Sequence, residues 1–564
     1  MEPPVLRAPA LLLLLTSLAL PPAADPGFWS KLPDGEIAQR IVQEMSDEEL
    51  VGQVLMLGYT GTSPSPEFLN WIQIRHIGGV KIFTRNVESL PSLAQSIRRM
   101  QSSADGSRWQ IPLFVATDQE GGWVRQIKGE TSVTPGNIAL GASGLPRDAL
   151  LTGYYIGLEL KKLGINMNFA PTIDVYSNPQ ASVIGPRAFS SDPVTTSFLS
   201  LAYFKGMSHS GIVCTAKHYP GHGQADRDSH GWLPVVNICF DELWERDLLP
   251  YRVLIPEGLP AVMSGHLAYP RVLGDLTPAS LSPYFIHEVL RERLGFDGLV
   301  VTDDLEMNGA LFGGIDTARA CELALRAGND MVLISHSPQV QEQAWRHLLH
   351  TLKSDSAFKQ GLQDSVRRIL GLKLRAFKGG IPLLPEQPLN PSAVRSENAE
   401  SFFRESALRS VTLLGKGSIP FKPRPGERIL LIGQFEEFLA QGKGAYPQAE
   451  TLLFPFSPFY SAEEQTRAQV HLRASRFDTL ILCLANYNSL QILKDLKDLG
   501  KKIIVISALT PVYLAETPWL DSCLAVYGTG ADSFKAGFAA LSGQYVPEGK
   551  LSVHFLNLEG GAAR

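Results

Sequence analysis

The chain has 564 residues, which is enough for two or three domains that each bury a core of their own. Hydrophobic residues make up 44% of it and charged residues 19%, a composition typical of globular proteins and not of disordered ones. The net charge of −5 and the isoelectric point near 6.2 leave no basic surface, so we expect no nucleic-acid partner.

The N-terminus has the pattern of an export signal. Arg7 precedes an apolar run at residues 10–20, which has the length of a signal-peptide core and is too short to cross a bilayer. Small residues at 21–24 then offer a cleavage site. We therefore expect residues 1–24 to be a signal peptide and the protein to be exported to the periplasm or the extracellular space. An uncleaved N-terminal anchor is the alternative. No later segment is apolar for long enough to span a membrane.

Residues 25–377 are predicted to form a (β/α)₈ barrel. Short apolar runs rich in β-formers alternate there with stretches suited to helices, which indicates parallel strands joined by crossovers. An open doubly wound sheet is the rival fold. The predicted strands are residues 53–59, 80–84, 112–118, 167–174, 213–218, 261–266, 299–304 and 331–335.

Ionisable residues at the ends of these strands favour the barrel over the open sheet. A closed barrel brings the carboxyl ends of its strands around one mouth, whereas an open sheet spreads them along an edge. Five predicted strands end in such residues, namely Asp118, Asp174, Lys217 with His218, His266, and Asp303 with Asp304.

A second domain is predicted after the barrel. Glycine and proline cluster at residues 379–391, within a predicted linker at 378–395. Residues 396–564 are then expected to form a smaller α/β sandwich with its own parallel sheet. Its apolar runs end in few ionisable residues, so we expect a structural or substrate-shaping role. The predicted strands are residues 428–433, 479–485, 503–509 and 523–528, and helical segments are expected at 399–408 and 488–499.

The cysteines are sparse and odd in number, and most lie inside apolar runs. We interpret them as small buried hydrophobic residues and not as a disulfide framework or a metal cage. They are Cys214, Cys239, Cys321, Cys483 and Cys523.

The richest loop in the sequence is KHYPGHGQADRDSH, at residues 217–230. One interpretation is a metal site, and its candidate ligands are His218, His222, Asp226, Asp228 and His230. Zinc sites use fixed sets of such residues, but no regular spacing is visible here and glycine and proline separate the histidines. A catalytic loop is therefore favoured over a metal cage.

Asp228 and His230 can act as a pair in this loop. Two residues apart in an extended segment, they can face the same way. A carboxylate bonded to one imidazole nitrogen fixes the tautomer and raises the basicity of the other nitrogen. His230 then becomes a general acid and base. The alternative is that both side chains are simply solvated.

The segment VVTDDLEM at residues 300–307 ends a buried strand with two carboxylates. Burying a carboxylate costs free energy unless it is paired or functional. Because side chains alternate along a strand, only one of Asp303 and Asp304 is expected to face the mouth, where it can act as a nucleophile. Capping of a helix N-terminus is the alternative role, and it suits Asp304.

Two further segments carry polar residues that suit a sugar. Asp118 begins the sequence DQEGG, where a carboxylate before paired glycines can accept hydrogen bonds from hydroxyl groups. Phosphate binding is the weaker interpretation of DQEGG, because an acidic loop repels anions. Arg187 lies in IGPRAFS and on its own proves little.

Together these segments resemble glycoside hydrolase family 3, and in particular its β-N-acetylhexosaminidase branch. The similarity covers the whole predicted barrel, and the second domain is similar to the C-terminal sandwich of two-domain members. The matching segments, in order, are residues 78–86, 118–122, 168–175, 184–190, 217–230, 262–266 and 301–307.

The resemblance implies a role for individual residues. Asp303 matches the family's nucleophile, and Asp228 with His230 matches the Asp–His dyad that replaces the usual acid/base carboxylate. No metal and no organic cofactor is implied. The residues that match sugar-binding positions are Asp118, Arg187, Lys217 and His218.

One departure from the family pattern follows Gly122. The family usually reads EGG-Arg-Val-Gln-Arg, whereas this chain has Trp123, Val124, Arg125 and Gln126 there. The usual second arginine is therefore Gln126. Either a sugar contact is lost, or Arg125 supplies it from another direction.

The resemblance implies a retaining β-N-acetylglucosaminidase that acts on peptidoglycan fragments or chitin oligosaccharides through a covalent glycosyl-enzyme. A glycoside phosphorylase or a β-glucosidase on the same scaffold is the alternative. A metal-dependent hydrolase and a non-catalytic saccharide-binding protein are less favoured, the latter because the nucleophile and the dyad are intact. The sequence leaves the oligomeric state open.

Overall fold

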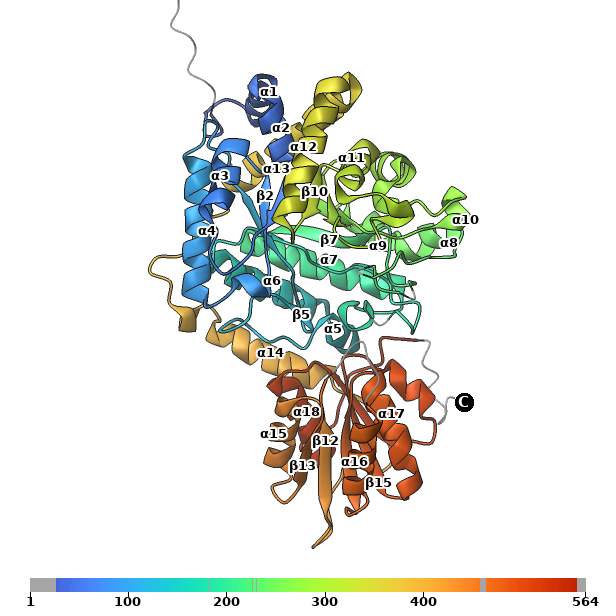
Figure 1. Ribbon diagram of the computed structural model, residues 1–564. Helices are drawn as coiled ribbons and strands as arrows, with labels where there is room; N and C mark the ends of the chain where they lie inside the picture. The colour runs from blue at the N-terminus through green and yellow to red at the C-terminus, as the bar shows by residue number, and fades with distance from the viewer. Residues whose placement is uncertain (1–26, 182, 226, 230, 457–462, 555–564) are drawn as a thin grey trace, which may run out of the picture.

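The computed structural model describes residues 27–181, 183–225, 227–229, 231–456 and 463–554. Two bodies are visible in Figure 1, a barrel with its helices in blue to yellow and a smaller body in orange to red beside it. The predicted signal peptide lies outside the described residues, and so do Asp226 and His230.

The larger body is a closed barrel of eight parallel strands, in the order β1-β10-β9-β8-β7-β6-β3-β2. This confirms the predicted (β/α)₈ fold. The strands are β1 (Leu55–Gly58), β2 (Gly79–Ile82), β3 (Phe114–Thr117), β6 (Met167–Asn168), β7 (Val213–Tyr219), β8 (Ala261–Ser264), β9 (Leu299–Asp304) and β10 (Met331–Ile334).

One predicted strand, residues 167–174, is much shorter in the structure. β6 ends at Asn168, and beyond it a single bridge joins Thr172 to Lys217. Pro171 has no N–H to donate to a ladder, which explains why regular pairing stops there. The irregular segment after β6 places Asp174 beside the end of β7, where Asp174 accepts a hydrogen bond from His218 N.

Helices surround the barrel and bury one face against it. α7 shows how its ends are set: the Asp192 side chain accepts a hydrogen bond of 2.7 Å from Thr195 N, and Gly211 ends the helix with a φ of 88°. The helices are α1 (Asp34–Glu44), α2 (Asp47–Gln53), α3 (Pro66–Arg75), α4 (Leu90–Asp105), α5 (Asn137–Ser143), α6 (Pro146–Lys162), α7 (Pro193–Ser210), α8 (Phe240–Glu242), α9 (Leu249–Leu254), α10 (Pro270–Leu273), α11 (Thr317–Ala327), α12 (Pro338–Ser354) and α13 (Ser356–Lys378).

Short 3₁₀ and π-helical segments and one small hairpin complete the barrel's loops. The hairpin consists of β4 (Gln119–Gly121) and β5 (Val124–Arg125) and follows β3 directly. The short helices of the barrel are η1 (Thr84–Asn86), η2 (Gly185–Arg187), η3 (Leu243–Asp247), η4 (Ala279–Leu281), η5 (Tyr284–Arg293) and η6 (Phe312–Gly314).

The smaller body has a six-stranded sheet in the order β11-β16-β15-β14-β12-β13, with helices on its faces. The strands are β11 (Thr412–Lys416), β12 (Ile429–Gly433), β13 (Glu450–Leu453), β14 (Thr479–Leu484), β15 (Lys502–Ala508) and β16 (Ser522–Tyr527). The helices are α14 (Glu397–Ser410), α15 (Glu436–Ala445), α16 (Glu464–Ala474), α17 (Tyr487–Leu496), η8 (Lys497–Leu499), η9 (Pro511–Glu516) and α18 (Ala531–Ser542).

The four strands predicted for the second sheet are parallel, but the sheet also has an antiparallel strand at one edge. β11 runs antiparallel to β16, whereas the other pairs are parallel. β11 precedes the repeated strand–helix units, so no crossover dictates its direction. Both edge strands, β11 and β13, escaped prediction because edge strands need few buried apolar residues. In β13, three of four side chains are exposed.

The two bodies pack against each other through a shared apolar cluster. It joins α5, Tyr176 and Ile184 of the barrel side to Ala525 and Tyr527 of β16. Between α13 and α14, residues 379–396 form a connection that contains the short helix η7 (Pro391–Ala393). The domain limits predicted from the sequence, at residues 377 and 396, remain a proposal.

Polar contacts reinforce this junction. Arg409 donates two hydrogen bonds, of 2.9 and 3.0 Å, to the carboxylate of Asp148. Ser190 Oγ donates one of 2.7 Å to Ser552 O, which ties the end of the chain back to the barrel. The second body is therefore anchored to α6 and to the loop that leaves β6.

All five cysteines lie in the described part of the chain, and each has a free thiol. Four are buried and Cys239 is half-buried, which agrees with their interpretation as small hydrophobic residues. Over the described residues, no helix has the length and apolarity needed to cross a membrane.

Candidate active site

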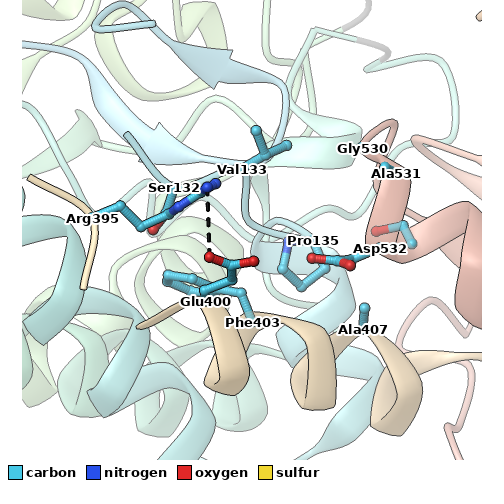
Figure 2. Close-up of a pocket in the computed structure, with 11 residues that line it drawn as sticks. Ser132, Val133, Pro135, Arg395, Glu400, Phe403, Ala407, Gly530, Ala531 and Asp532 are labelled. Atoms are coloured by element: carbon cyan, nitrogen blue, oxygen red, sulfur yellow. Dashed lines mark ion pairs between the residues drawn. The ribbon is translucent and has the colours of Figure 1, made fainter. Parts of the chain in front are cut away.

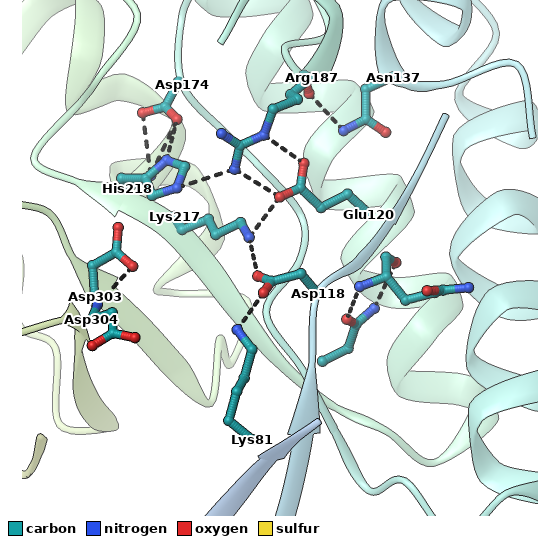
Figure 3. A network of polar contacts seen from close by, with 12 residues as sticks. Lys81, Asp118, Glu120, Asn137, Asp174, Arg187, Lys217, His218, Asp303 and Asp304 are labelled. Atoms are coloured by element: carbon teal, nitrogen blue, oxygen red, sulfur yellow. Dashed lines mark hydrogen bonds and ion pairs between the residues drawn. The ribbon is translucent and has the colours of Figure 1, made fainter. Parts of the chain in front are cut away.

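Charged side chains converge at the carboxyl ends of the barrel strands, as Figure 3 shows. Asp118, just after β3, accepts a hydrogen bond of 2.6 Å from Lys217 Nζ and a second from Lys81 Nζ. Burial alone would raise the pKa of Asp118, but the two ammonium groups outweigh it and hold the pKa well below its usual value. Asp118 is therefore ionised and can accept hydrogen bonds from a ligand.

Glu120 is a member of this network that the sequence interpretation missed. Its side chain is fully buried, and its Oε1 lies 2.6 Å from Lys217 Nζ. Arg187 donates to both carboxylate oxygens, with distances of 2.9 and 2.8 Å. Although burial raises the pKa of Glu120, Arg187 and Lys217 lower it to about 2. Glu120 therefore fixes the positions of both cations.

His218 connects the network to Asp174. The imidazole Nδ1 lies 2.8 Å from Asp174 Oδ2, and the opposite nitrogen, Nε2, lies 3.2 Å from Arg187 Nη2. Asp174 Oδ1 also accepts hydrogen bonds from two backbone N–H groups, that of His218 at 3.2 Å and that of His222 at 2.6 Å. Asp174 is thus a positioning residue that holds the His218 ring and the start of the following loop.

The two carboxylates at the end of β9 point to opposite sides, as strand alternation predicts. In Figure 3 the Asp303 carboxylate lies on the side of Lys217 and His218, and Asp304 points away from them. Burial raises the pKa of Asp303, but His218, His266, the Asp304 N–H and Lys217 together lower it to about 2. Asp303 is therefore an ionised carboxylate at the barrel mouth.

Asp304 has a structural role, though it does not cap a helix, which is the alternative considered for it. It accepts hydrogen bonds from Ser335 Oγ and, at 3.0 Å, from Glu306 N. Residues 305–311 form turns and no helix, so Asp304 closes a turn instead. His266 is also structural, because its ring lies between Ser280 Oγ at 2.8 Å and Asp304 O at 3.1 Å.

The predicted dyad is only partly within the described structure. Asp228 follows β7 in the loop, and its backbone oxygen accepts hydrogen bonds from Gly231 N and Trp232 N, at 3.2 and 3.1 Å. His230 lies outside the described residues. The pairing of Asp228 with His230 therefore stays a prediction.

His222 lies in the buried part of the loop, beside His218. It is buried, and burial lowers its pKa to about 4, so the ring stays neutral near pH 7. Its ring meets that of His218 edge to face, with 5.6 Å between the centroids. Within the described ranges, no group of three or more His, Cys, Asp or Glu side chains could hold a metal ion.

A cavity of about 510 Å³ opens beside this network, between the barrel mouth and the second body. Arg187, His222 and Asp228 line it from the barrel, and Asn486, Thr510 and Tyr513 line it from the other side. Arg187 belongs to both the cavity and the charged network. The cavity therefore adjoins the charged network through Arg187.

A smaller cavity of about 120 Å³ lies between residues 132–135, α14 and the start of α18 (Figure 2). Its charged side chains include Arg395 and Glu400, whose nearest atoms are 3.6 Å apart. None of the residues of the Asp118–Lys217 network lines this cavity. It is therefore separate from the charged network.

Comparison with known proteins identifies the family. A family model for the glycosyl hydrolase family 3 N-terminal domain matches residues 46–372. The chain belongs to glycoside hydrolase family 3. It is accordingly a glycoside hydrolase, and the family's N-terminal domain covers its barrel.

Individual relatives agree with this assignment. Beta-hexosaminidase A of Pseudoalteromonas piscicida is 35% identical over 422 residues, which cover 67% of this chain and 69% of the relative. A family 3 β-N-acetylglucosaminidase from Paenibacillus sp. str. FPU-7 superposes with a TM-score of 0.83 at 29% identity, covering 90% of this chain and 99% of its own. A β-glucoside phosphorylase shares the fold, with a TM-score of 0.76 at 22% identity and coverage of 92% and 96%.

In this glycoside hydrolase, Gln126 stands where the family usually has a second arginine, and its side chain has a structural role. Gln126 Oε1 accepts hydrogen bonds from Thr84 N at 3.0 Å and Thr84 Oγ1 at 2.8 Å, so it ties β5 to the end of β2. Arg125 donates to Thr131 O and Oγ1, both at 3.1 Å. Arg125 therefore holds the 131–132 loop, and we expect the arginine contact to be lost.

Proposed function

We propose that this family 3 enzyme is a retaining β-N-acetylglucosaminidase that removes terminal β-linked N-acetylglucosamine from peptidoglycan fragments or chitin oligosaccharides. One observation carries the proposal: Asp303 is an ionised carboxylate at the barrel mouth, on the side of Lys217 and His218. An ionised carboxylate can attack an anomeric carbon. The names of the Pseudoalteromonas and Paenibacillus relatives support N-acetylhexosamine as the sugar.

The proposed reaction has two steps. Asp303 attacks the anomeric carbon, the bond to the leaving oxygen breaks, and His230 transfers a proton to that oxygen. The product of this step is a glycosyl ester on Asp303. His230 then removes a proton from water, the water oxygen attacks the anomeric carbon, and Asp303 leaves as a carboxylate. The configuration at the anomeric carbon is retained because it is inverted twice.

The dyad suits this role on chemical grounds. Most retaining enzymes use a second carboxyl group about 5 Å from the first as acid and base. An imidazole has an ordinary pKa of about 6.5, close to working pH, so it needs little adjustment to give and take a proton. In the proposal, Asp228 orients the ring of His230 by a hydrogen bond.

The charged network is the proposed binding site for the sugar's hydroxyl groups. Asp118 offers an ionised acceptor, Lys217 and Arg187 offer donors, and Asp174 orients the His218 ring beside them. These groups are held by Glu120 and Asp174, so they need not reorganise when a sugar binds. Such preorganisation lowers the cost of orienting the substrate.

Export remains part of the proposal. The apolar run at residues 10–20, after Arg7, supports a signal peptide. An exported enzyme would meet the proposed cell-wall or chitin substrates outside the cytoplasm.

Turnover of two nitrophenyl glycosides tests the proposed function. We expect the enzyme to cleave the β-N-acetylglucosaminide far better than the β-glucoside, and to release free sugar at a rate that inorganic phosphate does not change. Preference for the glucoside would make the enzyme a β-glucosidase. Release of a sugar 1-phosphate only when phosphate is present would make it a phosphorylase.

A further inference from the structure

The cavity at the junction of the two bodies is built from both of them. On the second body it lies at the carboxyl ends of β14 and β15, where Asn486, Leu509 and Thr510 line it, and Tyr513 of η9 completes that wall. In open parallel sheets, ligands bind in the crevice outside the carboxyl ends of the strands. The second sheet thus presents its ligand-binding edge to the barrel mouth.

Trp123 lies at the barrel side of this cavity, where this chain departs from the family pattern. It occupies the tip of the β4–β5 hairpin directly after Gly122, whose φ of 61° and close approach to Gly136 require glycine. The Trp123 side chain is 43% exposed and lines the cavity. Its ring lies 5.3 Å from that of Phe456 in the second body. An aromatic platform therefore spans both bodies.

The position of Asp228 indicates which part of a substrate would occupy the cavity. Asp228 lines the same cavity as Trp123 and Tyr513. In the proposed mechanism, on which this inference rests, Asp228 orients the acid that protonates the leaving oxygen. The groups beside that acid therefore face the leaving group, whereas the Asp118–Lys217 network faces the sugar that is transferred.

We propose that Trp123, Phe456 and Tyr513 form a subsite for the sugar ring on the leaving-group side of the scissile bond, so that the second body selects the substrate. The faces of aromatic rings pack against the C–H faces of a pyranose, and neutral polar groups bind its hydroxyls. The second body supplies such groups in Asn486 and Thr510. The occupant is a saccharide ring, not a phosphate or a metal ion.

The test compares a disaccharide with a substrate whose leaving group is too small to reach the subsite. The substrates are N,N′-diacetylchitobiose and methyl β-N-acetylglucosaminide. For Trp123→Ala, and separately for Tyr513→Ala, the ratio of kcat/KM for the disaccharide to kcat/KM for the methyl glycoside should fall about 10-fold, as expected for loss of one aromatic contact. Trp123→Phe should restore most of the ratio because it keeps a ring at the tip of the hairpin.

Tyr487→Ala is the matched control, because Tyr487 is a 52% exposed tyrosine of the same body that does not line the cavity. Its ratio should equal that of the wild type. Thermal unfolding checks that each variant is folded, and the ratio cancels any loss of active enzyme. An unchanged ratio in both Trp123→Ala and Tyr513→Ala overturns the subsite and leaves the proposed function standing. A wild-type enzyme that releases N-acetylglucosamine from neither substrate overturns the function itself.

Discussion

Replacing Lys217 by methionine should strongly destabilise the barrel. The ammonium group is 2% exposed and lies 2.6 Å from both Asp118 and Glu120. Methionine preserves most of the side-chain volume, so the change removes the charge and leaves two buried carboxylates with fewer partners. Breaking a buried ion pair by removing one member costs about 3–5 kcal/mol. We expect the free energy of unfolding to fall by about that amount at pH 7.

The pKa values of the two carboxylates predict how the destabilisation by Lys217→Met depends on pH. The pKa values of Asp118 and Glu120 are lowered in the folded enzyme, so their ionisation contributes stability above the unfolded pKa of about 4, and this contribution is lost as the pH falls through the folded pKa values. Without Lys217 both folded pKa values should rise, because one neighbouring cation is gone. The deficit of Lys217→Met should therefore be largest at neutral pH and smaller near pH 4.

Urea unfolding at pH 7 and at pH 4.5 measures the effect, with Lys205→Met as the matched control. Lys205 pairs with Glu257 at 2.8 Å, but their side chains are 36% and 50% exposed. Such a surface pair contributes less than about 1 kcal/mol. The reasoning is refuted if Lys217→Met costs no more than Lys205→Met at pH 7.

Three further predictions concern the mouth and the groups beneath it. Asp303→Asn should lower kcat roughly 10⁴-fold or more while Asp304→Asn keeps most activity, and the reverse order in steady-state assays would assign the nucleophile to Asp304. Asp247 is buried and its pKa is raised to about 6, so its ionisation costs stability as the pH rises above 4. Urea titrations should therefore show Asp247→Asn gaining about 3 kcal/mol relative to wild type between pH 4 and pH 8, and no gain would mean that Asp247 ionises freely. Dialysis against EDTA should leave activity unchanged, whereas a loss that zinc restores would return the 217–230 loop to the metal interpretation.

The barrel could be predicted from the sequence because its strands are short, apolar and separated by helix-length segments. The predicted 299–304 is β9 to the residue, and 213–218 is β7 but for its last residue. The prediction failed where the chain leaves regular pairing, as after Asn168, because a run such as MNFAPTID looks like a strand until Pro171 breaks the ladder.

Only part of the candidate site could be predicted from the sequence, and the reason is different. Asp118, Lys217 and His218 end strands and are found by that position, but Lys81 and Glu120 are not in the predicted site. Lys81 interrupts the apolar run VKIFT at an inward-facing position, and this signal could have been used. Glu120 lies two residues after Asp118, so alternation along an extended segment would place both side chains on the same side, and this spacing is a second signal that could have been used. Both carboxylates contact Lys217 of β7, far along the chain, and no local pattern encodes that contact.

The role of the second body could be predicted only in general terms, as structural or substrate-shaping. Its strand ends carry neutral and aromatic residues, which read as ordinary packing in the sequence. Their placement in one cavity with Trp123 and Asp228 across the domain junction is what supports the proposed subsite. Contacts between segments more than 300 residues apart produce no periodic pattern in the sequence.

The central claim is that Asp303 forms a covalent glycosyl-enzyme, and mass spectrometry of a trapped intermediate tests it most directly. In His230→Ala, dinitrophenyl β-N-acetylglucosaminide should still glycosylate the enzyme, because its leaving group needs little protonation, while hydrolysis of the ester lacks its base. The intermediate should accumulate, and peptide mapping should find one N-acetylhexosamine on the peptide that contains Asp303. An enzyme that turns over without any adduct, or an adduct on another residue, would contradict the account.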